Sequence, residues 1–289
     1  MTYLRIIFIC SLLLGLSACS PSKTPLPIPT FSPPTPTPTP SPMPTTIPTT
    51  TPLACLNQPG RVSSGVVQTT KPAQEFLIYL PPCYDFKTDQ RYPVLYLLHG
   101  QTYIDDQWAR LGVPAAADNL INSGNAQPFI MVFPDDRYWN VEAGPDFGDR
   151  FINGVIPYVD SNFRTIADRQ HRALGGLSRG GGWTIKLGLT RYDLFGTLGF
   201  HSPAIFVEDA AYIDKWLTAI PHDQWPRIWI DAGDHDSQLG LTKQFENMLS
   251  QHAIPHEWHM YTGDHSETYW QAHVAEYIQW YADGWSNNP

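Results

Sequence analysis

The stretch Ala173-Leu174-Gly175-Gly176-Leu177-Ser178-Arg179-Gly180-Gly181-Gly182 decides how this chain is built. An apolar run leads directly into glycines around a single serine, and a helical pattern follows. Gly176-x-Ser178-x-Gly180 has the spacing of a nucleophile elbow, a sharp turn between a strand and a helix. Glycines on both sides of the serine remove side chains that would collide in such a turn. The stretch therefore predicts a reactive serine whose following helix points its amides at a developing oxyanion.

Other glycine-rich turns between a strand and a helix fit this stretch poorly. The G-x-G-x-x-G spacing of a dinucleotide-binding loop is absent, and no lysine follows Gly181 as a phosphate-binding loop would require. A turn in which the glycines have only a structural role remains the alternative.

Outward from the serine, short apolar runs alternate with longer amphipathic stretches. Strands are predicted over residues 62–68, 75–80, 94–98, 129–133, 173–177, 197–200, 227–230 and 257–261. Helices are predicted over residues 115–123, 149–163, 181–190, 209–219, 241–252 and 267–280. The later strands are near-continuous hydrophobic blocks, which is typical of strands covered on both faces. The pattern predicts an α/β fold with a mostly parallel central sheet, helices on both faces and an antiparallel N-terminal edge.

A serine elbow of this type needs an acid and a histidine later in the chain, in that order. The strand at 227–230 runs into Asp231-Ala232-Gly233-Asp234-His235-Asp236, and the strand at 257–261 runs into Thr262-Gly263-Asp264-His265. His265 is the predicted base, whereas His201 precedes every candidate acid. Position alone does not choose the acid among the three aspartates that follow the earlier strand.

A metal site is the competing interpretation of the segment Asp234-His235-Asp236. However, His256-Glu257-Trp258-His259 is one residue short of the zinc-binding spacing H-E-x-x-H, and no other cluster completes a ligand set. The sequence therefore predicts no metal.

The oxyanion hole would use two backbone amides. One belongs to Arg179, which directly follows the serine. The other comes from the loop after the strand at 94–98, which continues as His99-Gly100-Gln101. Gly100 permits close approach of the backbone, and the amide of Gln101 is the candidate donor.

The N-terminus predicts export. Residues 1–18 carry one basic residue and then an apolar core that is too short to span a bilayer, as in a signal peptide. Leu16-Ser17-Ala18-Cys19 resembles a bacterial lipobox, so Cys19 is the predicted site of lipidation. An ordinary secretory signal cleaved after Ala18 is the alternative. A lipid anchor would hold the catalytic domain on the extracytoplasmic side of a membrane.

Composition separates a linker from a folded domain. Residues 19–53 contain 13 of the 28 prolines and 10 threonines, a composition that favours an extended tether without a core. Residues 54–289 are long enough for one α/β domain. The formal net charge is −9 and no Lys/Arg run occurs, which argues against a nucleic-acid partner.

Cysteines and tryptophans add structural and pocket candidates. Cys55 and Cys83 remain as a pair in an exported domain and are predicted to form a disulfide, with two free thiols as the alternative. Trp108 and Trp139 follow strand ends near the predicted site and are candidates for a substrate pocket. Trp270 is expected to pack behind His265.

Taken together, the motifs resemble the α/β-hydrolase esterase family that includes esterase D, feruloyl esterases, enterochelin esterases and mycolyltransferases. The resemblance covers residues 75–280. Its segments are Tyr79-Leu80-Pro81-Pro82, Tyr92-Pro93-Val94-Leu95-Tyr96-Leu97-Leu98-His99-Gly100, Asp105-Asp106-Gln107-Trp108, Ile156-Pro157-Tyr158-Val159-Asp160, Gly176-Leu177-Ser178-Arg179-Gly180-Gly181, Gly233-x-x-Asp236 and Gly263-x-His265.

The resemblance implies a serine esterase that needs no cofactor and uses Ser178, His265 and Asp236. It selects Asp236 because the family's acid ends a Gly-x-x-Asp loop. The substrate would be a small-molecule or polysaccharide-linked ester. Arg179 stands where relatives often have Met, and Ser266-Glu267 follows the histidine in place of Asp and an aromatic residue. Acyl transfer to another acceptor, and a surface binding protein without catalysis, are the alternative functions.

Overall fold

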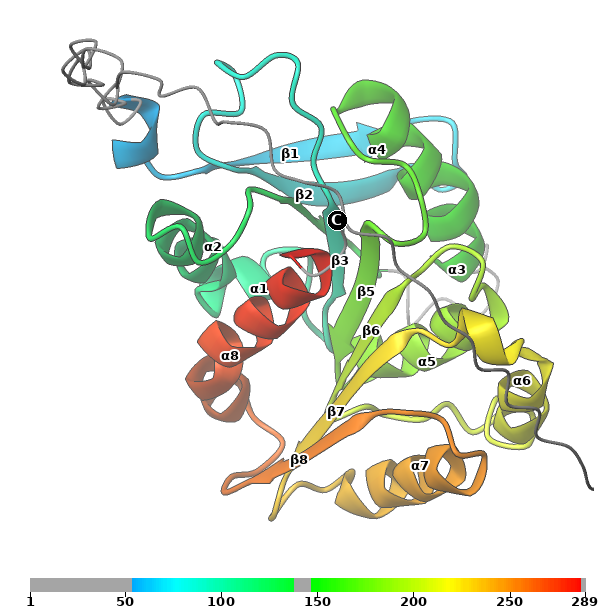
Figure 1. The fold of residues 1–289 in the computed structure, drawn as a ribbon. Coiled ribbons are helices and arrows are strands. Elements are labelled where there is room, and N and C mark those ends of the chain that lie inside the picture. The colour runs from blue at the N-terminus through cyan, green and yellow to red at the C-terminus, as the bar shows by residue number, and fades with distance from the viewer. Residues whose placement is uncertain (1–53, 138–146, 287–289) are drawn as a thin grey trace, which may run out of the picture. The chain divides into compact units, whose positions relative to one another are not determined.

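The computed structural model describes residues 54–137 and 147–286 (Figure 1). All of them belong to one of the two units into which the chain divides, Thr50–Pro289. The predicted signal peptide, Cys19, the linker and Trp139 lie outside the described residues. Among the described residues, no helix is both long enough and apolar enough to cross a membrane.

Eight strands form one mixed sheet, in the order β1-β2-β4-β3-β5-β6-β7-β8. Their bounds are β1 Arg61–Val67, β2 Gln74–Leu80, β3 Val94–Leu98, β4 Ile130–Pro134, β5 Arg172–Leu177, β6 Thr197–His201, β7 Arg227–Gly233 and β8 Glu257–Tyr261. The pairs β1–β2 and β2–β4 are antiparallel and the remaining pairs are parallel. The predicted parallel sheet with an antiparallel N-terminal edge is confirmed.

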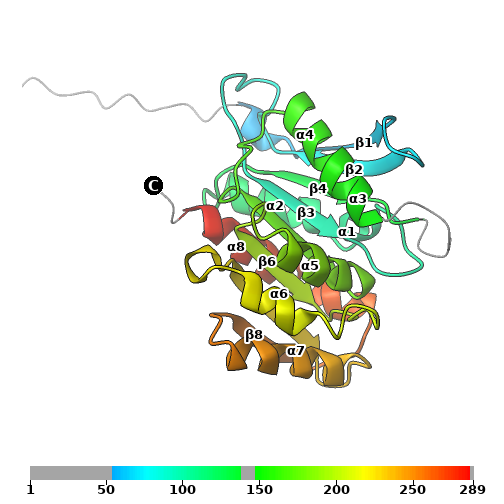
Figure 2. The same ribbon diagram turned by 90° about the vertical axis from the view of Figure 1, so that its right-hand side faces the viewer.

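Helices cover both faces of the sheet, as Figures 1 and 2 show. One face carries α1 Gln107–Arg110, α2 Val113–Asn122 and α8 Glu267–Ser286. The other carries α3 Phe147–Arg150, α4 Ile156–Asn162, α5 Arg179–Thr190, α6 Ile213–Ala219 and α7 Leu239–Gln251. Two short 3-10 helices, Ala54–Asn57 and His222–Gln224, and a π-helical turn, Phe151–Val155, complete the described elements.

The hydrophobic blocks of the central strands explain this layering. Every residue of β3, β4, β5 and β6 is buried, so successive side chains enter opposite cores. In β3, Tyr96 packs into the core under α3–α7, while Leu95 and Leu97 pack into the core under α1, α2 and α8. Burial on both sides aligns the carboxyl ends of the parallel strands along one edge, where the predicted site residues lie.

One predicted helix, residues 149–163, is in fact three consecutive segments. A π-helical turn, Phe151–Val155, separates α3 from α4. Pro157 lies in the first turn of α4 and has no N–H to donate to the carbonyl four residues earlier, so the regular hydrogen-bond ladder is interrupted there.

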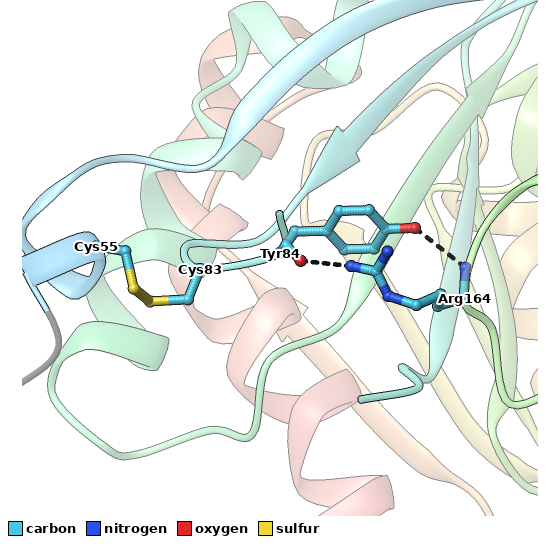
Figure 3. Close-up of a disulfide and its surroundings, with 4 residues drawn as sticks. All are labelled: Cys55, Cys83, Tyr84 and Arg164. Atoms are coloured by element: carbon cyan, nitrogen blue, oxygen red, sulfur yellow. Dashed lines mark hydrogen bonds between the residues drawn. A yellow bond between two sulfur atoms is a disulfide. The ribbon is translucent and has the colours of Figure 1, made fainter. Parts of the chain in front are cut away.

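The predicted disulfide joins Cys55 to Cys83 (Figure 3). It ties the segment before β1 to the loop after β2. Beside it, the guanidinium of Arg164 lies over the ring of Tyr84 at 3.8 Å and donates to the Tyr84 carbonyl, while the Tyr84 hydroxyl accepts the Arg164 backbone N–H at 3.0 Å. The disulfide therefore attaches the segment before β1 to a loop that Arg164 holds against the rest of the domain.

Candidate active site

Ser178 sits on the turn between β5 and α5 with φ 52° and ψ −118°. Few residues other than glycine adopt this backbone conformation. A Cβ at Gly176 would lie 2.3 Å from the backbone of Gly180, and a Cβ at Gly180 would lie 2.1 Å from the Leu98 carbonyl oxygen. Both glycines are therefore required by the close approach of the backbone, as the elbow motif predicts.

The structure brings Ser178, His265 and Asp236 together in one hydrogen-bonded series. The Ser178 hydroxyl lies 2.8 Å from Nε2 of His265, and Nδ1 of His265 lies 2.9 Å and 3.1 Å from the two carboxylate oxygens of Asp236. A carboxylate only accepts hydrogen bonds, so Nδ1 carries the proton and Nε2 is free to accept the serine proton. Each of these side chains comes from the loop after a different strand: β5, β7 or β8.

The three aspartates after β7 have three separate environments. Asp236 reaches His265. Asp234 accepts hydrogen bonds from the Gly263 backbone N–H at 3.0 Å and from His235 at 2.7 Å, so it joins the two loops at the surface. Asp231 is fully buried and accepts hydrogen bonds from two tyrosine hydroxyls of α8. Of the three, Asp236 is the aspartate whose carboxylate contacts His265.

The environment of Asp236 favours its ionised form. Burial by itself would raise the pKa of this carboxyl, but hydrogen bonds from His265 and from the backbone N–H of Gln238 outweigh burial and hold the pKa below its ordinary value. Asp236 is therefore a carboxylate at neutral pH, as it must be to orient an imidazole and stabilise its charged form.

A cavity of about 110 Å³ opens in front of Ser178. Its walls include His265, Gln101, Tyr103, Glu267 and Trp270. Gln101, the predicted second oxyanion donor, thus lies at the same cavity as the serine. Arg179, the other predicted donor, is the first residue of α5, where backbone N–H groups have no partner within the helix.

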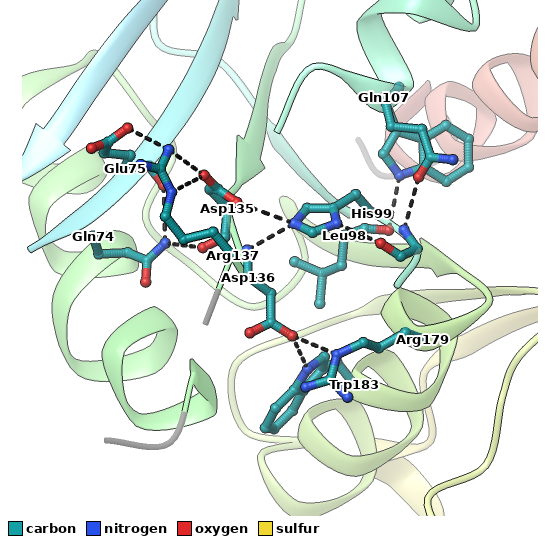
Figure 4. Close-up of polar contacts among 12 residues, drawn as sticks. Gln74, Glu75, Leu98, His99, Gln107, Asp135, Asp136, Arg137, Arg179 and Trp183 are labelled. Carbon is teal, nitrogen blue, oxygen red and sulfur yellow. Dashed lines mark hydrogen bonds and ion pairs between the residues drawn. The ribbon is translucent and has the colours of Figure 1, made fainter. Parts of the chain in front are cut away.

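A series of polar contacts fixes the backbone of the loop that carries His99 and Gly100 (Figure 4). The Gly100 N–H donates to Oε1 of Gln107 at 2.8 Å, and Nδ1 of His99 donates to the Gly100 carbonyl at 2.8 Å. His99 has its proton on Nδ1 because its Nε2 accepts the Asp136 backbone N–H at 2.7 Å. The Asp136 carboxylate in turn accepts hydrogen bonds from Arg179 and Trp183, both at 2.8 Å.

The three predicted tryptophan positions have different outcomes. Trp108 is only 1 % exposed, and its indole N–H donates to the Leu98 carbonyl at 2.9 Å. It supports the strand end from inside the core, so the expectation that it lines the pocket is corrected. Trp270 packs edge-on against His265 with ring centroids 5.0 Å apart, as expected. Trp139 lies outside the described residues.

A second His–Asp pair lies beneath the site, and the sequence did not predict it. Nδ1 of His201 lies 2.7 Å from Asp231, and its Nε2 lies 3.0 Å from the Tyr281 hydroxyl. Asp231 also accepts hydrogen bonds from Trp229, Tyr269 and Tyr277. The neighbouring Gly175 and Gly199 make room for Tyr281, whose hydroxyl lies within 2 Å of the position of a Cβ on either glycine. In the sequence, these two glycines were the signal that a large side chain packs against the centre of the sheet.

The sheet order, the elbow after β5 and the acid and histidine after β7 and β8 define an α/β-hydrolase fold. Residues 68–281 match the family described as "Putative esterase", and the chain belongs to this family. The family resemblance inferred from the motifs is thus confirmed.

Two relatives resemble this chain in sequence, and a solved structure resembles it in fold. An endo-1,4-beta-xylanase/feruloyl esterase from Xylanibacter ruminicola is 31 % identical over 195 residues, which cover 64 % of this chain and 25 % of the relative. Esterase Rv1288 from Mycobacterium tuberculosis is 26 % identical over 234 residues, covering 63 % and 50 %. This chain therefore spans a half or less of these two relatives. A solved ferulic acid esterase has a TM-score of 0.71 at 24 % identity, covering 79 % of this chain and 100 % of that one.

Proposed function

We propose that this protein hydrolyses carboxylic esters, with Ser178 as nucleophile, His265 as general base and Asp236 as the acid that orients it. The observation that carries the proposal is the hydrogen-bonded series from Ser178 through His265 to the ionised Asp236, at 2.8 Å and 2.9 Å. Membership of the esterase family supports it. A surface binding protein without catalysis would not need this aligned series.

In the proposed reaction, the Ser178 oxygen attacks the ester carbonyl while Nε2 of His265 takes its proton. The amides of Arg179 and Gln101 stabilise the oxyanion that forms. The bond to the alcohol then breaks, and His265 gives its proton to the leaving oxygen, which leaves an acyl-enzyme. His265 then takes a proton from a water molecule as that water attacks the acyl-enzyme ester. The bond between the acyl group and Ser178 breaks, the acid leaves, and His265 gives the proton to the Ser178 oxygen.

For the substrate, we propose a feruloyl or related aryl ester carried by a polysaccharide. This is supported by the relative named as a xylanase and feruloyl esterase and by the fold shared with a ferulic acid esterase. Hydrolysis of methyl ferulate should exceed hydrolysis of an alkyl acetate in kcat/KM. Equal or reversed preference would reject this substrate class but leave the esterase proposal intact.

For the location, we propose an exported domain tethered by lipidated Cys19 through the linker 19–53. The Cys55–Cys83 disulfide supports an oxidising compartment. A Cys19→Ser variant should move from the membrane fraction to the soluble fraction. Equal membrane association of the two proteins would contradict the anchor.

The test of the catalytic proposal is Ser178→Ala, assayed on a p-nitrophenyl ester. We expect kcat to fall by about 10⁴-fold or more because no nucleophile remains. Circular dichroism and the melting temperature serve as the control that the variant is folded. Wild-type hydrolysis by the folded variant would reject Ser178 as the nucleophile.

A further inference from the structure

Gln107 joins two loops of the site that are 160 positions apart in sequence. It is the first residue of α1, and its side chain is fully buried. Its Oε1 accepts the Gly100 N–H at 2.8 Å, and its Nε2 donates to Oε1 of Glu267 at 3.1 Å. Gly100 precedes the proposed oxyanion donor Gln101, and Glu267 follows the proposed base His265 by two residues.

At its Gly100 end, this bridge helps to fix the direction of the proposed oxyanion donor, the Gln101 N–H. The Gly100 carbonyl and the Gln101 N–H belong to one planar peptide unit and point in opposite directions. His99 holds that carbonyl from one side, while Gln107 holds the Gly100 N–H from the other. With both flanking groups fixed, the Gln101 N–H has one direction, which is what a preorganised oxyanion hole needs.

The Glu267 end is held by charge as well. Arg110, on the same short helix, contacts both carboxylate oxygens of Glu267, at 3.2 Å and 3.4 Å. Glu267 opens α8 and lies at the cavity beside His265. The helix α1 thus reaches from the oxyanion loop to the first turn of the element that follows the base.

We propose that Gln107 is a positioning residue of the esterase reaction, which sets the oxyanion loop against the His265 loop through its bridge from Gly100 to Glu267. The inference rests on the proposed function. Its consequence is kinetic: the bridge acts on the transition state, where the oxyanion forms, rather than on substrate binding.

The first variant is Gln107→Met, which keeps the length of the side chain and removes both hydrogen bonds. We expect kcat to fall by about 10- to 100-fold with KM changed less than about threefold, because misplacement of a catalytic donor lowers the rate of the chemical step. Tyr79→Phe is the matched control, since it removes a half-buried 2.7 Å hydrogen bond to Asp118 elsewhere in the fold. Its kcat should equal that of the wild type.

The second comparison separates positioning from stability. Gln107→Glu keeps an acceptor for the Gly100 N–H but places two carboxylates together. We therefore expect its kcat also to be lower than that of the wild type. Adding Glu267→Gln reverses the polarity of the bridge, because the new amide donates to the new carboxylate. We expect the double variant to recover at least about a third of wild-type kcat. This comparison decides the matter even if Gln107→Met does not fold.

Two results would overturn the inference. One is a folded Gln107→Met protein with kcat within threefold of the wild type. The other is failure of the polarity swap to raise kcat above that of Gln107→Glu when both proteins are folded. Failure of the proposed function looks different: the wild-type protein itself would not hydrolyse esters, and Ser178 would not react with a fluorophosphonate.

Discussion

Among the His–Asp pairs at the strand ends, His265–Asp236 and His201–Asp231 differ in what surrounds them. His265–Asp236 and His201–Asp231 have similar separations, 2.9 Å and 2.7 Å from Nδ1 to the carboxylate. In the first pair, Nε2 of the histidine faces the Ser178 hydroxyl at an open cavity. In the second, Nε2 meets the Tyr281 hydroxyl inside the core, and both residues are fully buried.

The difference shows that a histidine hydrogen-bonded to an aspartate at this distance is not by itself a catalytic pair. Two donors contact each Asp231 oxygen: His201 and Trp229 contact Oδ1, and Tyr269 and Tyr277 contact Oδ2. This arrangement satisfies a buried carboxylate and ties α8 to β6 and β7. The His265 pair instead leaves one imidazole nitrogen available to a reacting group. We therefore propose catalysis for the His265–Asp236 pair and structural support for the His201–Asp231 pair.

The largest expected effect is on the rate, at the His265–Asp236 pair. Asp236→Asn should lower kcat by about 10⁴-fold because the amide favours the wrong tautomer of His265. The backbone N–H of Gln238 can still donate to the amide oxygen, so the melting temperature should change little. The measurement is kcat on a p-nitrophenyl ester beside a thermal melt. A loss of less than tenfold would break the distinction between the two pairs.

The next effect is on stability, at the buried pair. Asp231→Asn puts an amide donor against phenol and indole donors, so the free energy of unfolding should fall by about 3 kcal/mol. Urea unfolding measures this loss. At a temperature where the variant stays folded, its kcat should stay within about tenfold of the wild type. A folded variant with 10⁴-fold lower kcat would show that this pair also acts in catalysis.

The disulfide supplies a matched control for that loss. Replacing Cys55 and Cys83 with serine opens a link between residues 28 positions apart, which lowers the free energy of unfolding by about 3 to 4 kcal/mol in the chain-entropy model. The bridge contacts neither His–Asp pair, so kcat of the folded protein should equal that of the wild type. If kcat fell as far as in Asp231→Asn, any rate change in that variant would reflect general destabilisation.

The smallest effect concerns a third carboxyl, Asp105. Burial, together with the nearby charge of Asp135, raises its pKa to about 6, opposite to the shift at Asp236. The protonated form is favoured on folding, so its contribution to stability is present at acid pH and is lost as pH rises through about 6. Asp105→Asn should therefore raise the melting temperature at pH 8 and leave it unchanged at pH 3.5. Equal shifts at both pH values would contradict this assignment.

The sheet and the elbow followed from the sequence because local patterns determine them. Eight apolar runs are long enough to be strands and lie between polar segments, and Gly176 and Gly180 stand where the backbone of the turn leaves no room for a Cβ. His265 could be predicted as the base because the chain order of the motif leaves few choices. The choice of Asp236 needed the family resemblance, since three aspartates follow the same strand.

The features that the sequence did not predict depend on long-range contacts. The helix α1 has four residues, too few for a helical period to show. The bridge made by Gln107 could therefore not be predicted, although Gln107 belongs to one of the segments that carry the family resemblance. Trp108 follows a strand end, yet its side chain turns inward to the Leu98 carbonyl. His201 was set aside because it precedes the acids, although Asp231 on the adjacent strand β7 is its partner.

The most direct test of the central claim is fluorophosphonate labelling followed by intact-mass measurement and peptide mapping. The reagent needs a serine whose proton is taken by a base, so it reads the difference between the two pairs. We predict one adduct, on Ser178, that is lost in His265→Ala and retained in a folded His201→Phe variant. A folded wild-type protein that gives no adduct, or an adduct on another serine, would contradict the account.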